Sequence, residues 1–332
     1  MPTFLSVDKI KAAWGSYYRP DSLGVADLKK QIMQSNDTQA YFPLQSTDET
    51  QVRGANMKLT NVTQPFYSRF SHLGTFDFVP YTWSLERVKI NIEMTPDDLA
   101  ATAIDFLAPK GLYKADAPIV KTIADYVLAK HKEDNENDII FKGVRKEVSS
   151  SDQTNRVAGA TVDSRTGIRH KIRLFNAAGK FAVNDTVIAM GAVPTDPVLF
   201  VTYMETMYYA IPELYRKFIM EMFMSTTLRQ RYRTGMRAKY NMYHAQVADL
   251  DKIIDTNCMI VGLPSMLSSD LIWCTIDGNR RGKIKNSSNS GVFNIEIYDT
   301  YNVRLSTDWY QGEDFYTPEL IWTNGRDLTL PA

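Results

Sequence analysis

The sequence predicts an α+β fold for a subunit that assembles with others rather than acting alone. Three observations favour it: a long helical segment at 95–137, strand-like segments on either side of it, and a later part that mixes helices with strands. If its two halves are collinear, the helical segment spans on the order of 50–60 Å at about 1.5 Å per residue. A compact domain does not need a rod of that length.

The helical segment begins and restarts on recognisable signals. Thr95 can cap a helix whose first position is Pro96. Pro109 and Gly111 interrupt the helix, and Asp116 can cap a second start. Apolar residues follow helical spacing in both halves, at Leu99, Ala103, Phe106 and Leu107 and again at Ile119, Ile123, Tyr126 and Val127.

The two segments before this helix are poor in apolar surface of their own. Residues 1–44 are predicted to form an irregular arm, and its aromatic residues Tyr17 and Tyr18 must pack either on their own subunit or on a neighbour. Residues 45–85 are polar and then strand-like, which predicts a long two-stranded hairpin that needs a partner surface. The alternation at 86–93 predicts a strand leading into the helix.

Charged and polar stretches follow the helix. The charged run 132–138 is interpreted as a solvated helix end, because its adjacent carboxylates do not have the spacing of a calcium loop. Residues 139–144 are predicted to be buried, and 148–167 to form a loop. The alternation at 168–174 predicts a strand with a basic outward face.

The later part of the chain begins with helices. Asp196 and Pro197 can start one helix, whose apolar pattern continues through 214–223. Another helix begins near Ser225 and Thr226 and carries four arginines, Arg229, Arg231, Arg233 and Arg237. Arginines interspersed with tyrosines occur in nucleic-acid sites and in protein interfaces. We favour the interface, because Arg and Tyr are both enriched there and because cations suit the later turns of a helix without any nucleic acid.

Short strands are predicted for the rest of the chain, at 253–262, 270–275, 292–298, 301–305 and 320–322. Only Asp299 and Thr300 separate the third of these from the fourth, which predicts a hairpin.

Composition narrows the possible functions. The 332 residues include 38 Lys and Arg and 38 Asp and Glu, so the formal charge is zero and gives no overall case for binding nucleic acid. The two cysteines have no spacing typical of a metal site or a disulfide framework. No apolar run approaches the ~20 residues of a membrane span and no secretory signal is visible, so we expect a soluble protein made in a cytoplasm.

Catalytic motifs are missing from the sequence. It contains no GxGxxG, Walker, HExxH or GxSxG motif, and its four histidines are scattered. We therefore expect no enzyme activity, no cofactor and no metal. An enzyme acting on polysaccharide stays open as a remote alternative because of the 18 tyrosines and five tryptophans.

A series of short motifs adds a resemblance. They are Gln64-Pro65-Phe66, Gly74 with Phe76-Asp77-Phe78-Val79-Pro80, Pro96-Asp97-Asp98-Leu99, Phe141-Lys142-Gly143, Met224-Ser225 with Tyr232, Val261-Gly262-Leu263-Pro264-Ser265-Met266, and Trp309 with Trp322. In this order, over most of the chain, they resemble the major capsid proteins of tailed bacteriophages with the Hong Kong 97-type fold. Together they look like a subgroup found in phages and prophages of Bacteroidetes-type hosts.

That resemblance implies the domain organisation and the partners. It implies an amino-terminal arm at 1–44, an extended loop at 45–85, a peripheral domain with the spine helix at 86–190 and 276–308, and an axial domain at 191–275 and 309–332. The subunit would form pentamers and hexamers of a virion head, assembled in the host bacterial cytoplasm, that encloses double-stranded DNA without binding it tightly. A separate scaffold protein, a portal and optional auxiliary head proteins are the other implied partners, and no membrane is involved.

The expected functional surface is therefore a subunit interface. Its candidate residues are the arm tyrosines and the cations of the loop and the arginine-rich helix: Tyr17, Tyr18, Arg53, Lys58, Arg69, Arg229, Arg231, Arg233 and Arg237. The nearest alternative is an encapsulin-type nanocompartment shell, which shares the fold but encloses cargo enzymes instead of DNA.

Overall fold

The computed structural model describes residues 37–66, 68–94, 119–241, 247–286, 294–299 and 302–330. Most of the predicted arm, with Tyr17 and Tyr18, and the first half of the predicted rod, 95–118, lie outside these residues.

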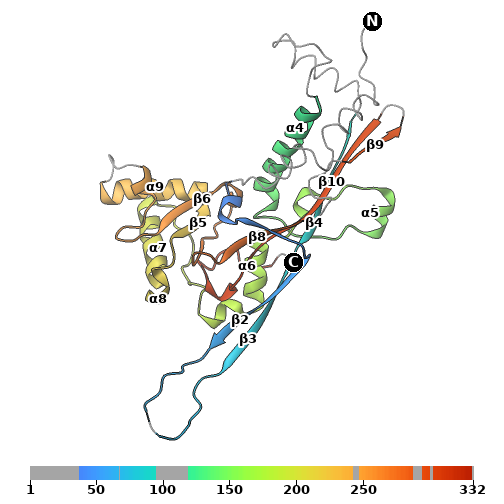
Figure 1. The fold of residues 1–332 in the computed structure, drawn as a ribbon. Helices are drawn as coiled ribbons and strands as arrows, with labels where there is room; N and C mark the ends of the chain where they lie inside the picture. Colours follow the sequence, from blue (N-terminus) through green and yellow to red (C-terminus); the bar gives the residue numbers. More distant parts are fainter. Residues whose placement is uncertain are drawn as a thin grey trace. The chain divides into compact units, whose positions relative to one another are not determined.

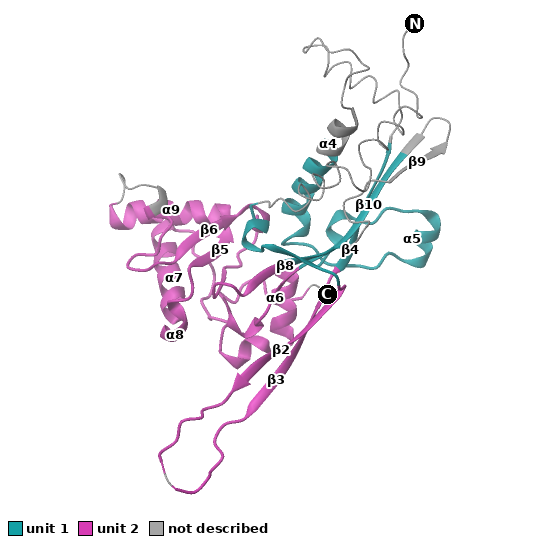
Figure 2. Ribbon diagram, in the orientation of Figure 1, with its two compact units in different colours: residues 1–48, 86–167, 283–312 teal, residues 49–85, 168–282, 313–332 magenta. Residues whose placement is uncertain are grey.

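The chain divides into two compact units (Figure 2). Unit 1 comprises residues 1–48, 86–167 and 283–312, and unit 2 comprises residues 49–85, 168–282 and 313–332. The chain passes from one unit to the other within strands β8 (Arg280–Lys285) and β10 (Asn302–Phe315).

Unit 1 is organised around a five-stranded sheet (Figure 1). The strand order is β1 (Leu44–Thr47), β8, β10 and β4 (Glu86–Met94), and β9 (Asn294–Asp299) also pairs with β10. β4 confirms the strand predicted at 86–93, and it runs antiparallel to β10 with Val88 opposite Trp309. The hairpin predicted from the strands at 292–298 and 301–305 is confirmed as β9–β10. β10 is longer than expected, because it continues to Phe315.

Helix α4 (Ile119–Asp134) packs on the buried face of that sheet. The His131 ring meets Trp309 edge-on, with ring centroids 5.0 Å apart, and Leu128 is buried. α4 confirms the second half of the predicted rod from Ile119 onward, and a π-helical turn, η4 (Asn135–Ile139), ends it. Residues 139–141 are buried, as predicted.

Short elements complete unit 1: η1 (Gln39–Tyr41), α5 (Ser150–Asn155) and η5 (Thr161–Asp163). The last two lie in the segment predicted as a loop. Ser149 explains the helical turn at α5, because its Oγ accepts a hydrogen bond from the Asp152 amide at 3.1 Å.

The strand predicted at 168–174 is wrong, because these residues form helix α6 (Ile168–Ala177). Ile168 and Ile172 are both buried, and a spacing of four residues fits a helix as well as an alternating strand. Lys171, predicted to face outward, lies 2.9 Å from the Asp314 carboxylate within unit 2. The local sequence pattern fitted a helix and a strand equally well, and contacts with distant residues such as Asp314 decided for the helix.

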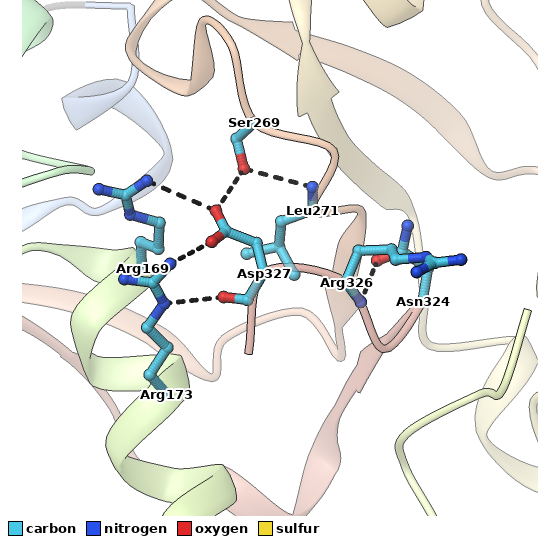
Figure 3. A network of polar contacts seen from close by, with 7 residues as sticks. All are labelled: Arg169, Arg173, Ser269, Leu271, Asn324, Arg326 and Asp327. Atoms are coloured by element: carbon cyan, nitrogen blue, oxygen red, sulfur yellow. Dashed lines mark hydrogen bonds and ion pairs between the residues drawn. The ribbon is translucent and has the colours of Figure 1, made fainter. Parts of the chain in front are cut away.

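Asp327 holds the other two basic residues of α6 (Figure 3). Arg169 and Arg173, four residues apart, share one face of the helix. The Arg173 guanidinium contacts the Asp327 carboxylate and its Nε donates to the Asp327 carbonyl at 2.8 Å, while Arg169 lies 3.5 Å from the carboxylate. Ser269 Oγ donates to the same carboxylate at 3.0 Å. The carboxyl-terminal segment is thus tied to α6.

The core of unit 2 surrounds a four-stranded sheet in the order β11 (Ile321–Thr323), β7 (Trp273–Thr275), β5 (Glu221–Ser225) and β6 (Met259–Leu263). Helices α7 (Pro197–Ala210) and α9 (Thr226–Tyr240) contribute to the same buried cluster. Both predicted helix starts are confirmed, because Asp196 and Ser225 cap α7 and α9 through their side-chain oxygens. Gly235 permits their close approach, since a Cβ there would overlap the Pro197 carbonyl.

Two other predictions for unit 2 are wrong in part. The apolar pattern at 214–223 is not one helix: α8 covers Glu213–Arg216, and Met222 and Phe223 lie in the buried strand β5. A strand buried on both faces has no alternation that would distinguish it from a helix. The strand predicted at 253–262 begins only at Met259, after a turn in which Asp255 has φ 59°.

The remaining elements of unit 2 are short, apart from the two strands of the long hairpin. They are η6 (Lys180–Val183), α10 (Val247–Leu250), η7 (Pro264–Met266), η8 (Pro318–Leu320), β2 (Gln51–Leu59) and β3 (Phe76–Ser84).

Candidate subunit interface

The long hairpin predicted at 45–85 is confirmed as the two-stranded ribbon β2–β3, which projects from the rest of unit 2 (Figure 2). Its register places Met57 opposite Phe78 and Lys58 opposite Asp77. Successive side chains point to opposite sides of a strand, so the ribbon has two distinct faces.

The inner face is anchored to the carboxyl-terminal part of unit 2. Asn56 Nδ2 donates to the Tyr316 carbonyl at 2.7 Å, and Lys58 Nζ lies 3.5 Å from the buried Glu319 carboxylate. The Trp83 ring meets Tyr316 edge-on at 5.6 Å between centroids. These contacts hold the base and middle of the ribbon in place.

The outer face presents apolar side chains to solvent. Met57, Leu59, Phe76 and Phe78 are 63%, 49%, 64% and 63% exposed, and the register pairs Met57 with Phe78 and Leu59 with Phe76. Burying what remains exposed of each side chain contributes about 1 kcal/mol, so the four together contribute on the order of 4 kcal/mol before the cost of association. A contiguous apolar patch of this kind marks an interaction surface.

The tip of the ribbon continues that surface. Gln64 Nε2 donates to the Ser71 carbonyl at 2.9 Å, and Ser71 Oγ donates to Gln64 Oε1 at 2.8 Å. These bonds close a loop that exposes Phe66 and Phe70 almost completely, at 96% and 95%. Exposing two phenylalanine side chains to water on one loop costs free energy, and covering them with another surface would recover it.

The structure separates the three candidate cations of this region. Arg53 lies on the outer face, in the same alternation as Met57. Lys58 lies on the inner face with Glu319, and Arg69 is exposed at the tip. Sequence reasoning selected cations and missed the apolar outer face, although the period-two pattern of this strand contained the signal.

The arginine-rich helix is confirmed as α9, and two of its arginines bind the same buried carboxylate. Arg233 Nε and Nη2 each lie 2.6 Å from an Asp251 oxygen, and Arg229 Nη2 lies 2.5 Å from Oδ2. Burial alone would raise the pKa of Asp251, but hydrogen bonds from the two guanidinium groups hold that pKa below its ordinary value. Asp251, from the turn after α10, was not predicted.

The other two arginines differ from each other. Arg231 Nη1 donates to the Pro194 carbonyl at 2.9 Å, and its guanidinium lies 5.8 Å from the centre of the Phe200 ring. Arg237 is exposed. Three of the four candidate arginines therefore contact their own unit, and the interface role of the set stays a prediction.

An open pocket of about 730 Å³ lies beside α8 in unit 2. It is lined by both charges and by polar groups, among them Glu213, Arg216, Lys217 and Asp255. Exposed apolar residues of unit 2 that extend from α7 to β5 include Tyr209, Leu214, Phe218 and Met220.

Comparison with solved structures decides which fold this is. A chain of the satellite phage P4 procapsid including size determination (Sid) protein matches 95% of this chain and 94% of its own length, with a TM-score of 0.54 and 13% identity. A chain from the capsid of an empty GTA particle matches 86% of this chain and 88% of its own length, with a TM-score of 0.51 and 12% identity. The fold is similar to that of capsid chains. No family model matches the chain, and no curated protein matches it in sequence.

Two kinds of site can be checked among the described residues, a metal site and a reactive thiol. No group of three His, Cys, Asp or Glu side chains among them is close enough to hold a metal ion. Burial raises the pKa of the Cys258 thiol to about 12, and it raises the pKa of Cys274 as well. Neither thiol is a nucleophile at neutral pH, because the thiolate is the reactive form. No helix of the described ranges is long and apolar enough to cross a membrane.

Proposed function

We propose that this chain is the major capsid protein of a tailed bacteriophage or prophage, and that it assembles with itself into an icosahedral head around double-stranded DNA. One observation carries the proposal: a fold similar to capsid chains bears an exposed apolar ribbon face at Met57, Leu59, Phe76 and Phe78. In a monomer this face stays in water and contributes no stability. In a shell every subunit can bury it against a neighbour, so that many individually weak contacts add up.

The proposal includes the roles of the parts. Residues 1–44 are the arm, 45–85 the extended loop, 86–190 with 276–308 the peripheral domain, and 191–275 with 309–332 the axial domain of a Hong Kong 97-type subunit. Pentamers and hexamers form in the cytoplasm of a bacterial host of the Bacteroidetes type, with a separate scaffold protein, a portal and optional auxiliary head proteins. The role is structural and needs neither an active site nor a cofactor.

A head is favoured over an encapsulin-type nanocompartment shell because two similar chains with TM-scores above 0.5 come from a procapsid and a GTA capsid. The two functions differ in what the particle holds. A phage head recovered from infected or induced cells contains DNA, whereas a nanocompartment contains protein cargo. Analysis of the contents of purified particles separates them.

The test of assembly compares the wild-type chain with the double variant Met57→Ser/Phe78→Ser. Wild-type protein expressed in bacteria should form closed particles, seen by electron microscopy and by sedimentation. The variant should remain folded, with an unchanged midpoint of thermal unfolding, and its assembled fraction should fall by about tenfold or more because each contact loses apolar area.

The matched control removes exposed apolar side chains elsewhere in unit 2. Leu174 and Val183 are 41% and 57% exposed on α6 and η6, so Leu174→Ser/Val183→Ser removes two exposed apolar side chains away from the ribbon. This control should assemble like the wild type. A wild-type chain that stays monomeric at every concentration, with and without scaffold protein, would refute the capsid function.

A further inference from the structure

The five-stranded sheet of unit 1 has one face on α4 and another that is charged. Val88, Leu305 and Trp309 alternate onto the buried face, so Arg87, Lys89 and Tyr310 point the opposite way. We call the second side the outer sheet face and define it by Arg87, Lys89, Lys285, Asp308 and Tyr310.

Cations from two strands, β4 and β8, converge on this outer sheet face on either side of β10. The Arg87 guanidinium lies 5.7 Å and the Lys285 ammonium 5.2 Å from the centre of the Tyr310 ring, so β4 and β8 both contribute a cation beside β10. Lys89 is exposed and lies opposite Asp308 in the register, and Arg87 Nε lies 2.7 Å from Asp308 Oδ2. The outer sheet face as defined thus holds three cations and one carboxylate, which pairs with Arg87, so it carries a positive surplus.

The opposite charge gathers at the carboxyl end of α4 and in η4, on the other side of the same sheet. Residues 130–138 hold four carboxylates and only two lysines, in addition to His131. Lys130 lies 3.1 Å from both Glu133 and Asp134, whereas Asp138 is exposed at the helix end and Glu133 is 59% exposed. We call this segment the acidic helix end.

The two charged surfaces cannot neutralise each other within one copy. His131, one residue from Lys130 on α4, packs on Trp309, so the helix lies on the buried side of the sheet (Figure 1). Tyr310 and Asp308, the neighbours of Trp309 in β10, point to the other side. Complementary surfaces on opposite sides of one unit can meet only between copies, and such a head-to-tail contact closes into a ring when its rotation permits.

We propose that the outer sheet face of one copy docks on the acidic helix end of a second copy. This proposal rests on the proposed self-assembly and names one of its contacts. Charge complementarity sets the register of the contact more than its strength, because the pairs are exposed and screened by salt.

Nucleic acid is the less favoured occupant of this face. Asp308 lies among the cations and would repel phosphate. The Tyr310 ring already contacts two cations, whereas sites for single strands keep their aromatic rings open for stacking with bases.

The experiment is a charge swap in the full chain. Lys89→Glu/Lys285→Glu reverses the outer sheet face, Glu133→Lys/Asp138→Lys reverses the acidic helix end, and a third variant combines all four substitutions. Lys89→Arg/Lys285→Arg keeps the charge and serves as the matched control. The assembled fraction is measured by sedimentation at low and at high salt, and circular dichroism checks the folding of each variant.

Each two-site reversal should lower the assembled fraction at low salt by about tenfold, the combined variant should restore it, and the arginine control should match the wild type. Assembly of either reversal like the wild type, or no gain in the combined variant, would overturn this contact while leaving the capsid function intact. Tight binding of duplex DNA that Lys89→Glu/Lys285→Glu abolishes without changing assembly would assign the face to nucleic acid and also overturn the proposal. A wild-type chain that never assembles would remove both proposals.

Discussion

At the scale of single residues, two carboxylates of unit 2 are each bound by two arginines of the same unit. Asp251 is 3% exposed and binds Arg229 and Arg233, and the partly exposed Asp327 binds Arg169 and Arg173. A buried carboxylate is stable only with such partners, because its desolvation costs several kcal/mol, on the order of the whole stability of a domain. The arginines of α9 therefore contribute to the fold before they contribute to any interface.

We predict that Arg229→Ala/Arg233→Ala lowers the free energy of unfolding by on the order of 3 kcal/mol, since the substitution leaves the Asp251 carboxylate buried without its guanidinium partners. Urea unfolding followed by circular dichroism measures it. The control Arg237→Ala changes an exposed arginine of the same helix and should stay within about 0.5 kcal/mol of the wild type. Equal stability of the double variant and this control would contradict the prediction.

His131 gives unit 1 a pH dependence that can be predicted with its sign. Burial, with a smaller effect of the Arg165 charge, lowers the pKa of His131 from 6.5 to about 4. The unfolded chain therefore binds this proton at a higher pH than the folded chain does. The stabilising contribution is complete above pH 6.5 and is lost as the pH falls toward 4, up to about 3 kcal/mol.

His131→Phe keeps an aromatic ring against Trp309 and removes the titration. We expect the free energy of unfolding of the wild type to fall more steeply than that of the variant between pH 6.5 and pH 4. Urea unfolding at several pH values compares the two slopes, and the carboxylates common to both proteins cancel in the difference. Parallel curves would show that His131 does not titrate in this way.

At the scale of elements, the β2–β3 ribbon is fixed on one face only. A two-stranded ribbon is marginally stable by itself, and here Asn56, Lys58 and Trp83 hold its base and middle while the outer face and the tip remain exposed. The ribbon can therefore pack its outer face against a neighbouring subunit without a change in the core of its own unit.

We predict that trypsin cleaves the free subunit after Arg69, in the exposed tip, and that assembly protects this bond. The fragments are identified by mass spectrometry after brief digestion of monomers and of particles. The exposed Lys146, on the other unit, provides an internal reference for general access of the protease. Equal cleavage at Arg69 in both states would contradict the docking of the ribbon on a neighbour.

At the scale of the whole molecule, 38 basic residues balance 38 acidic ones, so binding to DNA cannot come from net charge. Many described cations also lie within 4 Å of carboxylates of their own unit, as Arg229, Arg233 and Lys171 do. A head that packages DNA densely benefits from a wall that does not hold it.

We predict that the purified subunit binds duplex DNA weakly or not at all at physiological salt. Fluorescence anisotropy of a labelled duplex, titrated with subunit at low and physiological salt, measures it. Arg231→Ala/Arg237→Ala should leave the affinity near background and impair the formation of rings. Submicromolar, salt-sensitive binding that these two substitutions abolish would show that α9 is a nucleic-acid site instead.

The sequence by itself determined the elements whose signals are local. The alternation of Val88, Ile90 and Ile92 identified β4, and Asp196 and Ser225 identified the starts of α7 and α9, because alternation and capping involve only neighbours in the chain. Only the tertiary structure decided between helix and strand at Ile168, where both periods fitted. It also assigned Arg173 to Asp327, 154 residues away, and turned Met57 and Phe78 toward solvent. Contacts between distant segments depend on how elements pack, and no local pattern records which carboxylate a given arginine meets.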